Sequence, residues 1–380
     1  MSLGWRPRVF VVLVVAQVSL LGVVSAARQA GPGQAVQMSE NVFRNIQVLK
    51  GIPADEFMDT MGMFAASLLY DCTGCHVQDI LINREAFAES TPRIQMARQM
   101  VLMVNALNRT YFGGERRVTC FTCHRGSGRP DVEPDLALQY GDVSYTNADA
   151  MAIFPDPRGS ADQVFARYLE ALGGAERLAA LRSFVATGSY VGFNTSGQSV
   201  PVQIFASSPN RRSTVVTMFD GDAVTTFDGN NAWAAEGWRQ IPLMTFTGGN
   251  LAGARFDGTV AFPAGLPQAF SQWQVGNPRV IDGREMQVLQ GRNPGEPPVN
   301  LYFDEAGLLA RSIRWSSTPV GTVPTQTDYS DYRDVAGVKM PFRWVVTWTN
   351  GQNTFELAEV RPNVAIDPGR FSTPAPFAPR

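Results

Sequence analysis

The stretch "YDCTGCHVQD" at residues 70–79 contains the pattern on which the predicted architecture depends, and "VTCFTCHRGS" at residues 118–127 repeats it. Each stretch holds the pentad Cys-x-x-Cys-His. The chain has 380 residues with four Cys and two His, and the two pentads contain all of them. An arrangement that uses every Cys and every His in the same order, twice, indicates one chemistry that is repeated.

Covalent attachment of c-type haem accounts for every position of the pentad. The two thiols form thioethers with the haem vinyl groups, and the adjoining imidazole binds the iron. We therefore predict two covalently bound haem c groups. The predicted residues are Cys72, Cys75 and His76 for the first haem, and Cys120, Cys123 and His124 for the second.

Three other uses of paired cysteines fit the pattern less well. A zinc site of two Cys-x-x-Cys pairs usually spaces them by roughly 15–20 residues, and Cys75 and Cys120 are further apart. A thioredoxin-like pair requires a βαβ context, which the sequence does not predict. Structural disulfides occur in exported proteins, but they would leave both adjoining His unexplained.

The sixth iron ligand must come from another residue type, because both His are already proximal ligands. Methionine is abundant around the pentads, and a thioether ligand raises the haem potential. Spacing leaves Met58 or Met61 open for the first haem. It leaves Met96, Met100 or Met103 open for the second, and methionine at helical spacing also serves as core filler.

The N-terminus predicts export. Arg6 and Arg8 precede the apolar run "VFVVLVVAQVSLLGVVSA", which ends in small residues as secretory signals do. We predict a signal peptide over residues 1–27 and a periplasmic protein, with an uncleaved membrane anchor as the alternative. A net charge of −2 gives no reason to expect binding to nucleic acid.

Composition and periodicity divide the remaining chain into a haem-binding domain at 28–135, a linker at 136–160 and a β-rich domain at 161–380. In the first domain, a helix over 53–69 places Met58, Met61, Ala65, Leu68 and Leu69 on one face. A second helix begins at Thr91-Pro92, aligns its methionines on one face and ends at Gly113-Gly114.

The last domain begins with a short helix, "SADQVFARYLEALGG", and continues with strand patterns. Two Asp-Gly pairs in "TVVTMFDGDAVTTFDGNNAWAA" predict hairpins, and "PFRWVVTWTNG" alternates Phe342, Trp344, Val346 and Trp348 on one sheet face. We predict one large, antiparallel, strongly curved sheet over 183–365. An acidic cluster at Asp328, Asp331 and Asp334 is expected to be a solvated loop.

Two stretches, "NVFRNIQVLKGIPADEFMDTMGMF…DCTGCH" and "MARQMVLMVNALNRTYF…VTCFTCHRG", resemble the cytochrome c subunit of photosynthetic reaction centres over roughly residues 40–130. The family repeats helix, turn and Cys-x-x-Cys-His, with the distal methionine on the helix ahead of each motif. The resemblance implies Met58 and Met100 as distal ligands. The family usually carries four haems, whereas this sequence supports two. Among nearby arginines, Arg125 is the candidate partner for a haem propionate.

The C-terminal sequence resembles the periplasmic lipoprotein-carrier and lipoprotein-sorting family, at "ADQVFARYLEALGGAERLAALRSFVATGSYVGF" and "DYRDVAGVKMPFRWVVTWTNGQNTFELAEVRPNVAIDPGRFSTP". That resemblance implies a half-barrel, a curved antiparallel sheet around a helix, often with an apolar cavity. The expected fold class is therefore multidomain: an α-helical di-haem cytochrome c domain followed by a β-rich antiparallel half-barrel (α+β) domain. An apolar ligand in that domain is one expected partner.

These features predict an exported di-haem cytochrome that passes single electrons between periplasmic or membrane redox partners, and not an enzyme. Its partner proteins are not identified by the sequence, and a peripheral association with a membrane is part of the expectation. Two alternatives stay open. One is a haem peroxidase, although no further His exists to act as acid or base. The other is a carrier of lipid or another apolar ligand with accessory haems.

Overall fold

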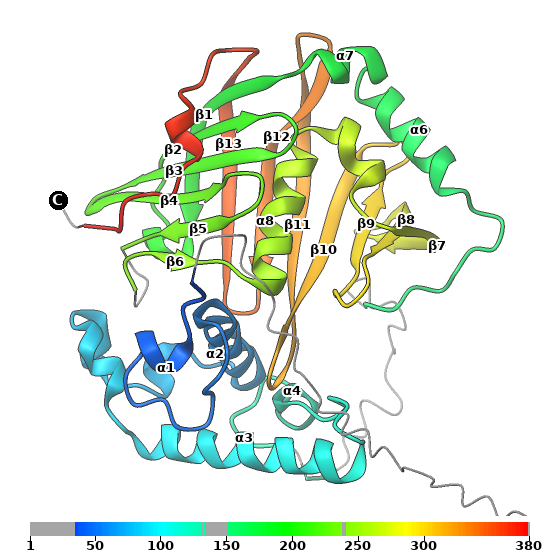
Figure 1. The fold of residues 1–380 in the computed structure, drawn as a ribbon. Coiled ribbons are helices and arrows are strands. Elements are labelled where there is room, and N and C mark those ends of the chain that lie inside the picture. The colour runs from blue at the N-terminus through cyan, green and yellow to red at the C-terminus, as the bar shows by residue number, and fades with distance from the viewer. Residues whose placement is uncertain (1–34, 131, 134–150, 238–240, 379–380) are drawn as a thin grey trace, which may run out of the picture.

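The computed structural model describes residues 35–130, 132–133, 151–237 and 241–378. The predicted signal peptide at 1–27 lies outside these residues. Among the helices that the described residues form, none has both the length and the apolar character needed to cross a membrane. The chain forms a helical part that contains both pentads and a large sheet above it (Figure 1), so the predicted fold class is confirmed.

The helical part contains four α-helices and three short 3-10 turns in the described residues. They are α1 (Ser39–Val42), α2 (Ala54–Leu68), η1 (Cys72–Gly74), η2 (Gln78–Leu81), η3 (Arg84–Ala88), α3 (Pro92–Tyr111) and α4 (Cys120–His124). The two predicted helices are confirmed as α2 and α3. Thr91 accepts a hydrogen bond from the Ile94 backbone N–H at 3.2 Å, and Pro92 occupies the first helical position.

α3 buries a face other than the one on which its methionines align. Met96 is 60% exposed and Met103 43% exposed, whereas Val101, Val104 and Asn108 are buried. The Asn108 amide explains this orientation. Its oxygen accepts hydrogen bonds from two backbone N–H groups of the following loop, and its Nδ2 donates to the Val118 carbonyl at 2.7 Å. These hydrogen bonds pair buried backbone groups of the loop, so the Asn108 face of α3 lies inward and the methionine face lies outward.

In the described residues, the second part forms one antiparallel sheet of thirteen strands, in the order β6-β5-β4-β3-β2-β1-β13-β12-β11-β10-β9-β8-β7. The strands of its first half are β1 (Ser183–Gly192), β2 (Val200–Ser207), β3 (Arg211–Met218), β4 (Gly221–Phe227), β5 (Ala232–Ala235) and β6 (Met244–Thr245). Those of its second half are β7 (Gln272–Ile281), β8 (Arg284–Arg292), β9 (Val299–Phe303), β10 (Leu309–Thr318), β11 (Gly321–Val335), β12 (Val338–Trp348) and β13 (Gly351–Pro362).

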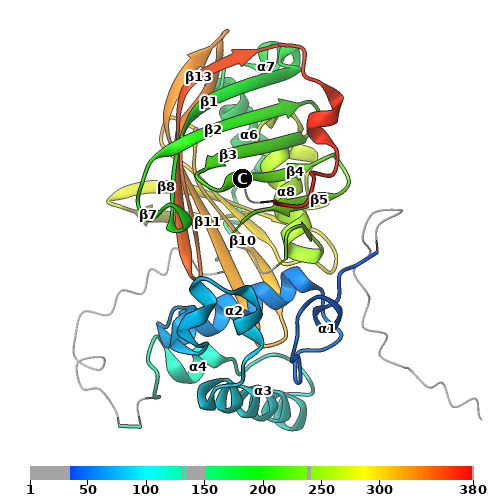
Figure 2. The ribbon, with the colours of Figure 1, turned by 90° about the vertical axis from the view of Figure 1, so that its left-hand side faces the viewer.

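Neighbouring strands are consecutive in sequence except where β1 pairs with β13. Phe219 and Asp220, directly before Gly221, connect β3 to β4, and residues 228–231, which begin with Asp228-Gly229, connect β4 to β5, so both predicted hairpins are confirmed. The single curved sheet predicted from strand periodicity is confirmed as well (Figure 2). Short connections of this kind keep each strand beside its sequence neighbour.

Three helices pack against the sheet: α6 (Ala161–Ala171), α7 (Ala175–Ala180) and α8 (Gly248–Val260). Short turns η4 (Phe193–Thr195), η5 (Pro263–Gln268) and η6 (Pro368–Phe371) complete this part. Helix α8 was not predicted from the sequence, because its glycines have low helix propensity. A Cβ at Gly258 would lie 2.0 Å from the Asn210 carbonyl oxygen, so the absence of a side chain lets the helix approach the sheet.

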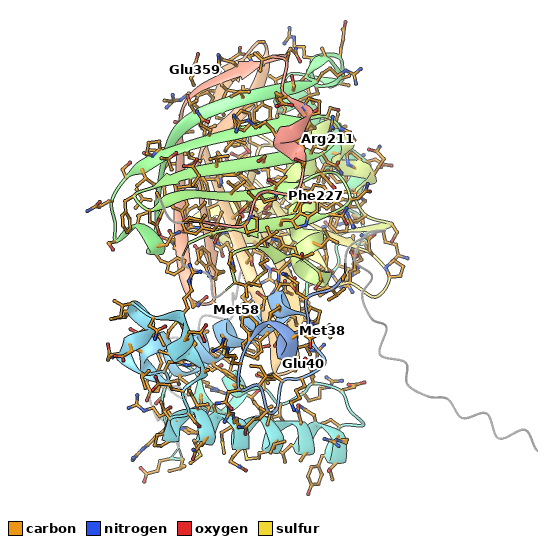
Figure 3. The ribbon with its side chains drawn as sticks, turned by 60° about the vertical axis from the view of Figure 1, so that its left-hand side comes forward. Met38, Glu40, Met58, Arg211, Phe227 and Glu359 are labelled. Carbon is orange, nitrogen blue, oxygen red and sulfur yellow. The ribbon has the colours of Figure 1, made fainter. Side chains whose placement is uncertain are left out.

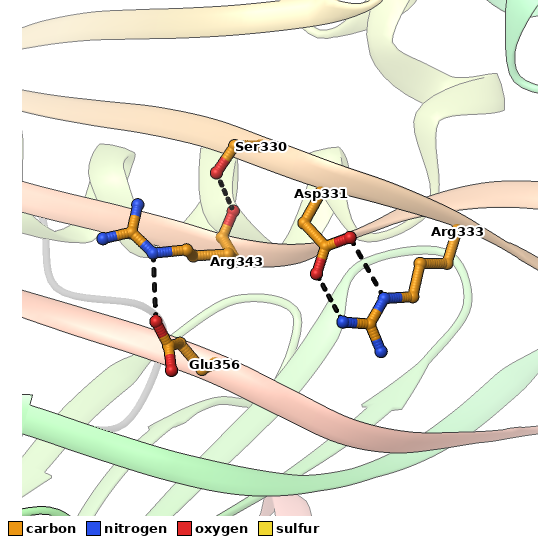
Figure 4. A network of polar contacts seen from close by, with 5 residues as sticks. All are labelled: Ser330, Asp331, Arg333, Arg343 and Glu356. Carbon is orange, nitrogen blue, oxygen red and sulfur yellow. Dashed lines mark hydrogen bonds and ion pairs between the residues drawn. The ribbon is translucent and has the colours of Figure 1, made fainter.

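The two faces of the sheet carry different chemistry. On β12, the predicted apolar row is confirmed, because Phe342 and Trp344 are buried among the core residues of the concave side. The intervening Arg343 is exposed and pairs with Glu356 of β13 at 3.1 Å (Figure 4). The acidic cluster expected in a loop lies instead within β11, where Asp331 pairs with Arg333 at 2.6 Å (Figure 4).

The other two acidic residues of that cluster are also bonded within the fold. Asp328 pairs with Arg311 at 2.5 Å, and Asp334 accepts the Gly337 N–H at 3.0 Å. The expectation of a loop was therefore wrong, because the long hairpin β11–β12 includes these positions and its exposed face tolerates charged side chains.

Part of the predicted linker pairs with the sheet. Residues 134–150 lie outside the described chain, but Asp156 donates its N–H to the Val275 carbonyl of β7 at 2.9 Å. The Phe154 carbonyl accepts the Asn277 N–H at 2.7 Å. Met151 and Ile153 pack against an apolar cluster that contains Ile313 and Trp315. The segment 151–156 thus covers the end of the sheet at β7.

The helical part and the sheet share a buried interface centred on α2. Asp55 in its first turn accepts hydrogen bonds from the Thr247 backbone N–H at 2.5 Å and the Thr247 hydroxyl at 2.8 Å. The Asn250 amide of α8 donates to Asp59 at 3.0 Å. Gln37 pairs with the β6 strand by accepting from the Thr245 N–H at 2.9 Å.

A second connection is the tip of the β10–β11 hairpin, which reaches into the helical part (Figure 1). Val320 at this tip is 1% exposed and belongs to one apolar cluster with Met63, Val101 and Cys120. Arg116 donates a hydrogen bond to the Thr318 carbonyl of the same hairpin. The core around the second pentad is therefore completed by a residue of the sheet.

Candidate functional site

The first pentad forms a single tight turn directly after α2. Leu69 ends the helix in a left-handed conformation with φ 50°, and η1 begins at Cys72. The Asp71 carboxylate accepts the Gly74 N–H at 3.0 Å, while the Cys72 carbonyl accepts the His76 N–H at 2.9 Å. Residues at positions i, i+3 and i+4 of a helical turn share a face, so the two thiols and the imidazole lie on one side.

The surroundings of His76 favour a neutral, ligating imidazole. Burial lowers the pKa of His76, and its ring packs edge-on against Phe87 with centroids 5.0 Å apart. Its Nδ1 is buried and has no hydrogen-bond partner among the described residues. Metal binding requires the neutral imidazole, so this environment fits a ligand better than a charged surface histidine.

The second pentad is the short helix α4. Thr119 and Thr122 form a reciprocal capping box, in which each hydroxyl accepts the other residue's backbone N–H. At the other end, Arg125 is left-handed with φ 47°, and Gly126 donates its N–H to the Ser67 carbonyl of α2 at 2.9 Å. The helix that precedes the first pentad thus supports the second pentad as well.

His124 has a defined tautomer. Its Nδ1 lies 2.9 Å from the Ser127 carbonyl oxygen, which can only accept a hydrogen bond. Nδ1 therefore carries the proton, and the lone pair of the neutral ring is on Nε2. Metal-bound histidines characteristically donate their second ring nitrogen to a carbonyl or carboxylate, and this contact fits that role.

The predicted distal methionines differ in what surrounds them. Met58 lies on α2 at the junction with the sheet (Figure 3), next to an apolar cluster that contains Ile241 and Met244. It also lines the same cavity as Cys72, Cys75 and His76. Met61 lines this cavity too, so both first-site candidates share one cavity with the first pentad.

At the second site the structure brings together fewer of the predicted residues. Met100 is partly buried on α3, and the adjacent Val101 shares an apolar cluster with Cys120. Arg125 is exposed beside the pentad. The roles of Met100 as a distal ligand and of Arg125 as a propionate partner stay predictions.

The cavity at the first site has a volume of about 1450 Å³. Its lower wall is the predicted apolar face of α2, all five residues of which line it: Met58, Met61, Ala65, Leu68 and Leu69. On the opposite side of α2, Met63 is buried in the cluster that contains Cys120 and Val320. The predicted face is thus the cavity side of α2.

The four pentad cysteines form no disulfide with one another in the structure. Burial raises the pKa of Cys72, of Cys75 and, to about 11, of Cys120. Within the described residues, no group of three or more His, Cys, Asp or Glu side chains is placed to hold a metal ion.

Residues 16–133 match the family model of the photosynthetic reaction centre cytochrome C subunit. The resemblance predicted from the helix-and-pentad repeat is thereby confirmed. The match spans both pentads, α2 and α3, and extends well beyond the Cys-x-x-Cys-His positions. It indicates a haem-binding electron-transfer protein of the cytochrome c type.

Solved structures similar to the chain cover its C-terminal part. A LolA superfamily protein from Nitrosomonas europaea is 11% identical, with 56% of this chain and 98% of that chain covered and a TM-score of 0.38. A DUF1329 family protein from Desulfovibrio piger is 9% identical, with 56% of this chain and 96% of that chain covered and a TM-score of 0.38. A putative outer membrane lipoprotein-sorting protein domain from Vibrio parahaemolyticus is 9% identical, with 55% of this chain and 97% of that chain covered and a TM-score of 0.37.

Sequence analysis missed the residues that join the pentads to the sheet. Asp55, Val320 and Thr247 are far apart in sequence, and none belongs to a motif. The one available signal was an aspartate near the start of an amphipathic helix. It was not decisive, because acidic residues are also common in exposed first turns. Its burial depends on contacts with α8, which itself was not predicted.

Proposed function

We propose that the chain is an exported di-haem c-type cytochrome that transfers single electrons between periplasmic or membrane redox partners. Cys72, Cys75 and His76 would hold the first haem. The second pentad, Cys120, Cys123 and His124, would hold the other. Bound haem supplies a one-electron Fe(III)/Fe(II) couple, and the protein's residues attach it, orient it and limit its contact with water.

The observation that carries this proposal is the state of the two histidines. The Nδ1 of His124 lies 2.9 Å from a carbonyl oxygen, which leaves Nε2 available, and burial lowers the pKa of His76 beside its two thiols. Structural cysteine sites do not require either arrangement. The match of residues 16–133 to a cytochrome c family supports the same chemistry.

The sixth ligands in this proposal are Met58 and Met100, the positions that the family resemblance implies. A thioether ligand and an apolar pocket both stabilise ferrous haem, so both haems would have relatively high potentials. Met58 meets this requirement best, because it lines the cavity next to His76 and also contacts an apolar cluster.

A peroxidase is the less favoured alternative. It requires an open or displaceable sixth site and a polar acid–base group above the iron. The chain has no His beyond the two in the pentads, and the α2 face toward the first pentad carries Met, Ala and Leu side chains.

A redox partner protein and a peripheral membrane association remain part of the proposal.

The test is an optical and stoichiometric experiment on the exported protein, made in cells that mature c-type cytochromes. A haem stain on a denaturing gel and an iron count of about two per chain are expected. The oxidised protein should be low-spin with a weak sulfur-to-iron band. The variant Met58→Ala should make one haem high-spin and lower its reduction potential, because the thioether is lost.

Met61→Ala is the matched control, since Met61 lies on the same face of α2 and lines the same cavity. It should leave the haem low-spin. A high-spin spectrum in Met61→Ala but not in Met58→Ala would reassign the ligand. Absence of any haem stain from the wild-type chain would refute the whole proposal.

A further inference from the structure

The cavity beside the first pentad continues far into the sheet. Residues of β11 from Val323 to Tyr332 line it, a distance of about 30 Å at ~3.3 Å per strand residue. Its volume of about 1450 Å³ exceeds the roughly 300–1,000 Å³ typical of a single ligand pocket. A group attached at Cys72 and Cys75 therefore accounts for one end only.

The sheet end of the cavity has a ring of aromatic side chains. Trp344 stacks on Phe355 with centroids 5.0 Å apart and an interplanar angle of 12°, and Tyr190 meets Phe355 edge-on at 5.1 Å. Trp344 is four positions before Trp348, about 13 Å along β12. The next residue, Thr349, packs against Gly62 of α2. The aromatic ring thus lies between α2 and the deeper cavity.

Charged side chains of both signs line this part of the cavity. Arg212 lies over the Trp344 ring at 5.7 Å and, with Arg314, contributes two cations to the lining. Asp257 and Glu236 contribute two anions, and Lys339 at the far rim is exposed. A charged head group buried here would lie among both cations and anions. The lining therefore favours an uncharged ligand that still accepts hydrogen bonds.

Beyond the aromatic ring the lining is apolar. Leu172, Phe184, Met340 and Leu357 line the far end and belong to the main core of the sheet. A long hydrocarbon chain would bury its surface there. The ligand that fits both halves has a flat, uncharged, oxygen-bearing ring and an extended apolar tail.

We propose that the cavity binds an isoprenoid quinone or its quinol, with the ring beside Trp344 on the α2 side and the tail toward Phe184. The choice of a redox-active ring rests on the proposed electron-transfer function, because α2 also carries Met58. The binding of a ring and chain rests on the cavity alone.

The experiment is equilibrium dialysis of the full haem-loaded chain against a decyl-substituted benzoquinone, quantified after extraction by its ultraviolet absorbance. The wild type should bind one quinone per chain. Trp344→Leu should weaken binding by about tenfold or more, because the ring loses its stacking surface. Tyr190→Leu should weaken it too, which covers the case that Trp344→Leu fails to fold.

Trp315→Leu is the matched control. Trp315 is equally large and buried but belongs to the cluster with Met286 and Tyr302, and it does not line the cavity. The affinity of the Trp315→Leu variant for the quinone should stay within about twofold of the wild-type value. Decanoic acid, with a similar chain and a charged head, should bind at least about tenfold more weakly than the quinone.

Three outcomes would overturn the proposal: no quinone on the wild type, equal binding by the Trp344→Leu and Trp315→Leu variants, or decanoic acid binding as tightly as the quinone. The last would show that the cavity selects an acyl chain. Haem stain and reduction by dithionite are recorded on the same samples. Their loss would refute the proposed cytochrome function, whereas intact haem without quinone binding would refute this inference alone.

Discussion

Substituting Val320 by Ala tests whether the sheet completes the core of the helical part. Val320 is 1% exposed at the β10–β11 tip and packs in a cluster with Met63, Val101 and Cys120. The change removes two methyl groups, worth about 1.6 kcal/mol at ~0.8 kcal/mol per buried carbon. A residual cavity adds to this, so the free energy of unfolding should fall by roughly 2–3 kcal/mol.

The assay is urea unfolding of the full chain, followed by far-ultraviolet circular dichroism for the sheet and by Soret absorbance for the helical part. Because the tip is shared, both transitions should shift to lower urea by the same amount. Val280→Ala is the control, since Val280 is 57% exposed on β7 and should change stability by less than about 0.5 kcal/mol. Equal effects of the two variants, or a shift in only one transition, would refute the shared core.

Two further perturbations probe the same interface. Burial raises the pKa of Asp55, so the folded chain binds its proton more tightly than the unfolded chain, and stability should fall as pH rises through that raised pKa. In urea titrations at a series of pH values, Asp55→Asn should remove this decrease in the free energy of unfolding. An unchanged dependence of that free energy on pH would contradict the role given to Asp55. Gly321→Ala should cost more than about 1 kcal/mol, because φ is +155° and the new Cβ would lie 2.0 Å from Met63 Cε. Gly295→Ala, with φ +74° and open space around it, should cost less in the same thermal melts.

Local signals in the sequence predicted the elements well. Thr91-Pro92 fixes the start of α3, and two Asp-Gly pairs place two hairpins, because capping and turn chemistry act within a few residues. The apolar face of α2 was also predictable. In contrast, hydrophobic periodicity cannot show which face of α3 is buried, because the burial of the polar Asn108 depends on its hydrogen bonds to the loop before the second pentad.

What the sequence could not predict is how distant segments meet. The cluster that contains Val320 and Cys120 brings together residues 200 positions apart, and it depends on the length of the β10–β11 hairpin. The glycines of α8 appear unfavourable for a helix by propensity. They become favourable only where other backbone passes within reach, as it does at Ser316 of β10 beside Gly249 and at Asn210 of the β2–β3 turn beside Gly258.

The composition of α2 follows from its having two partners. A surface helix usually turns charged residues to water, but α2 buries Asp55 and Gly62 where it meets the sheet. The small residue allows close contact, since a Cβ at Gly62 would lie 2.6 Å from the Thr349 hydroxyl oxygen. Met58 is three positions after Asp55 and four before Gly62, so it lies on the same side of the helix, and it also lines the cavity at the first pentad. Any shift of the sheet relative to α2 would therefore move the side chain proposed to bind iron, so we infer that the sheet holds that side chain in position.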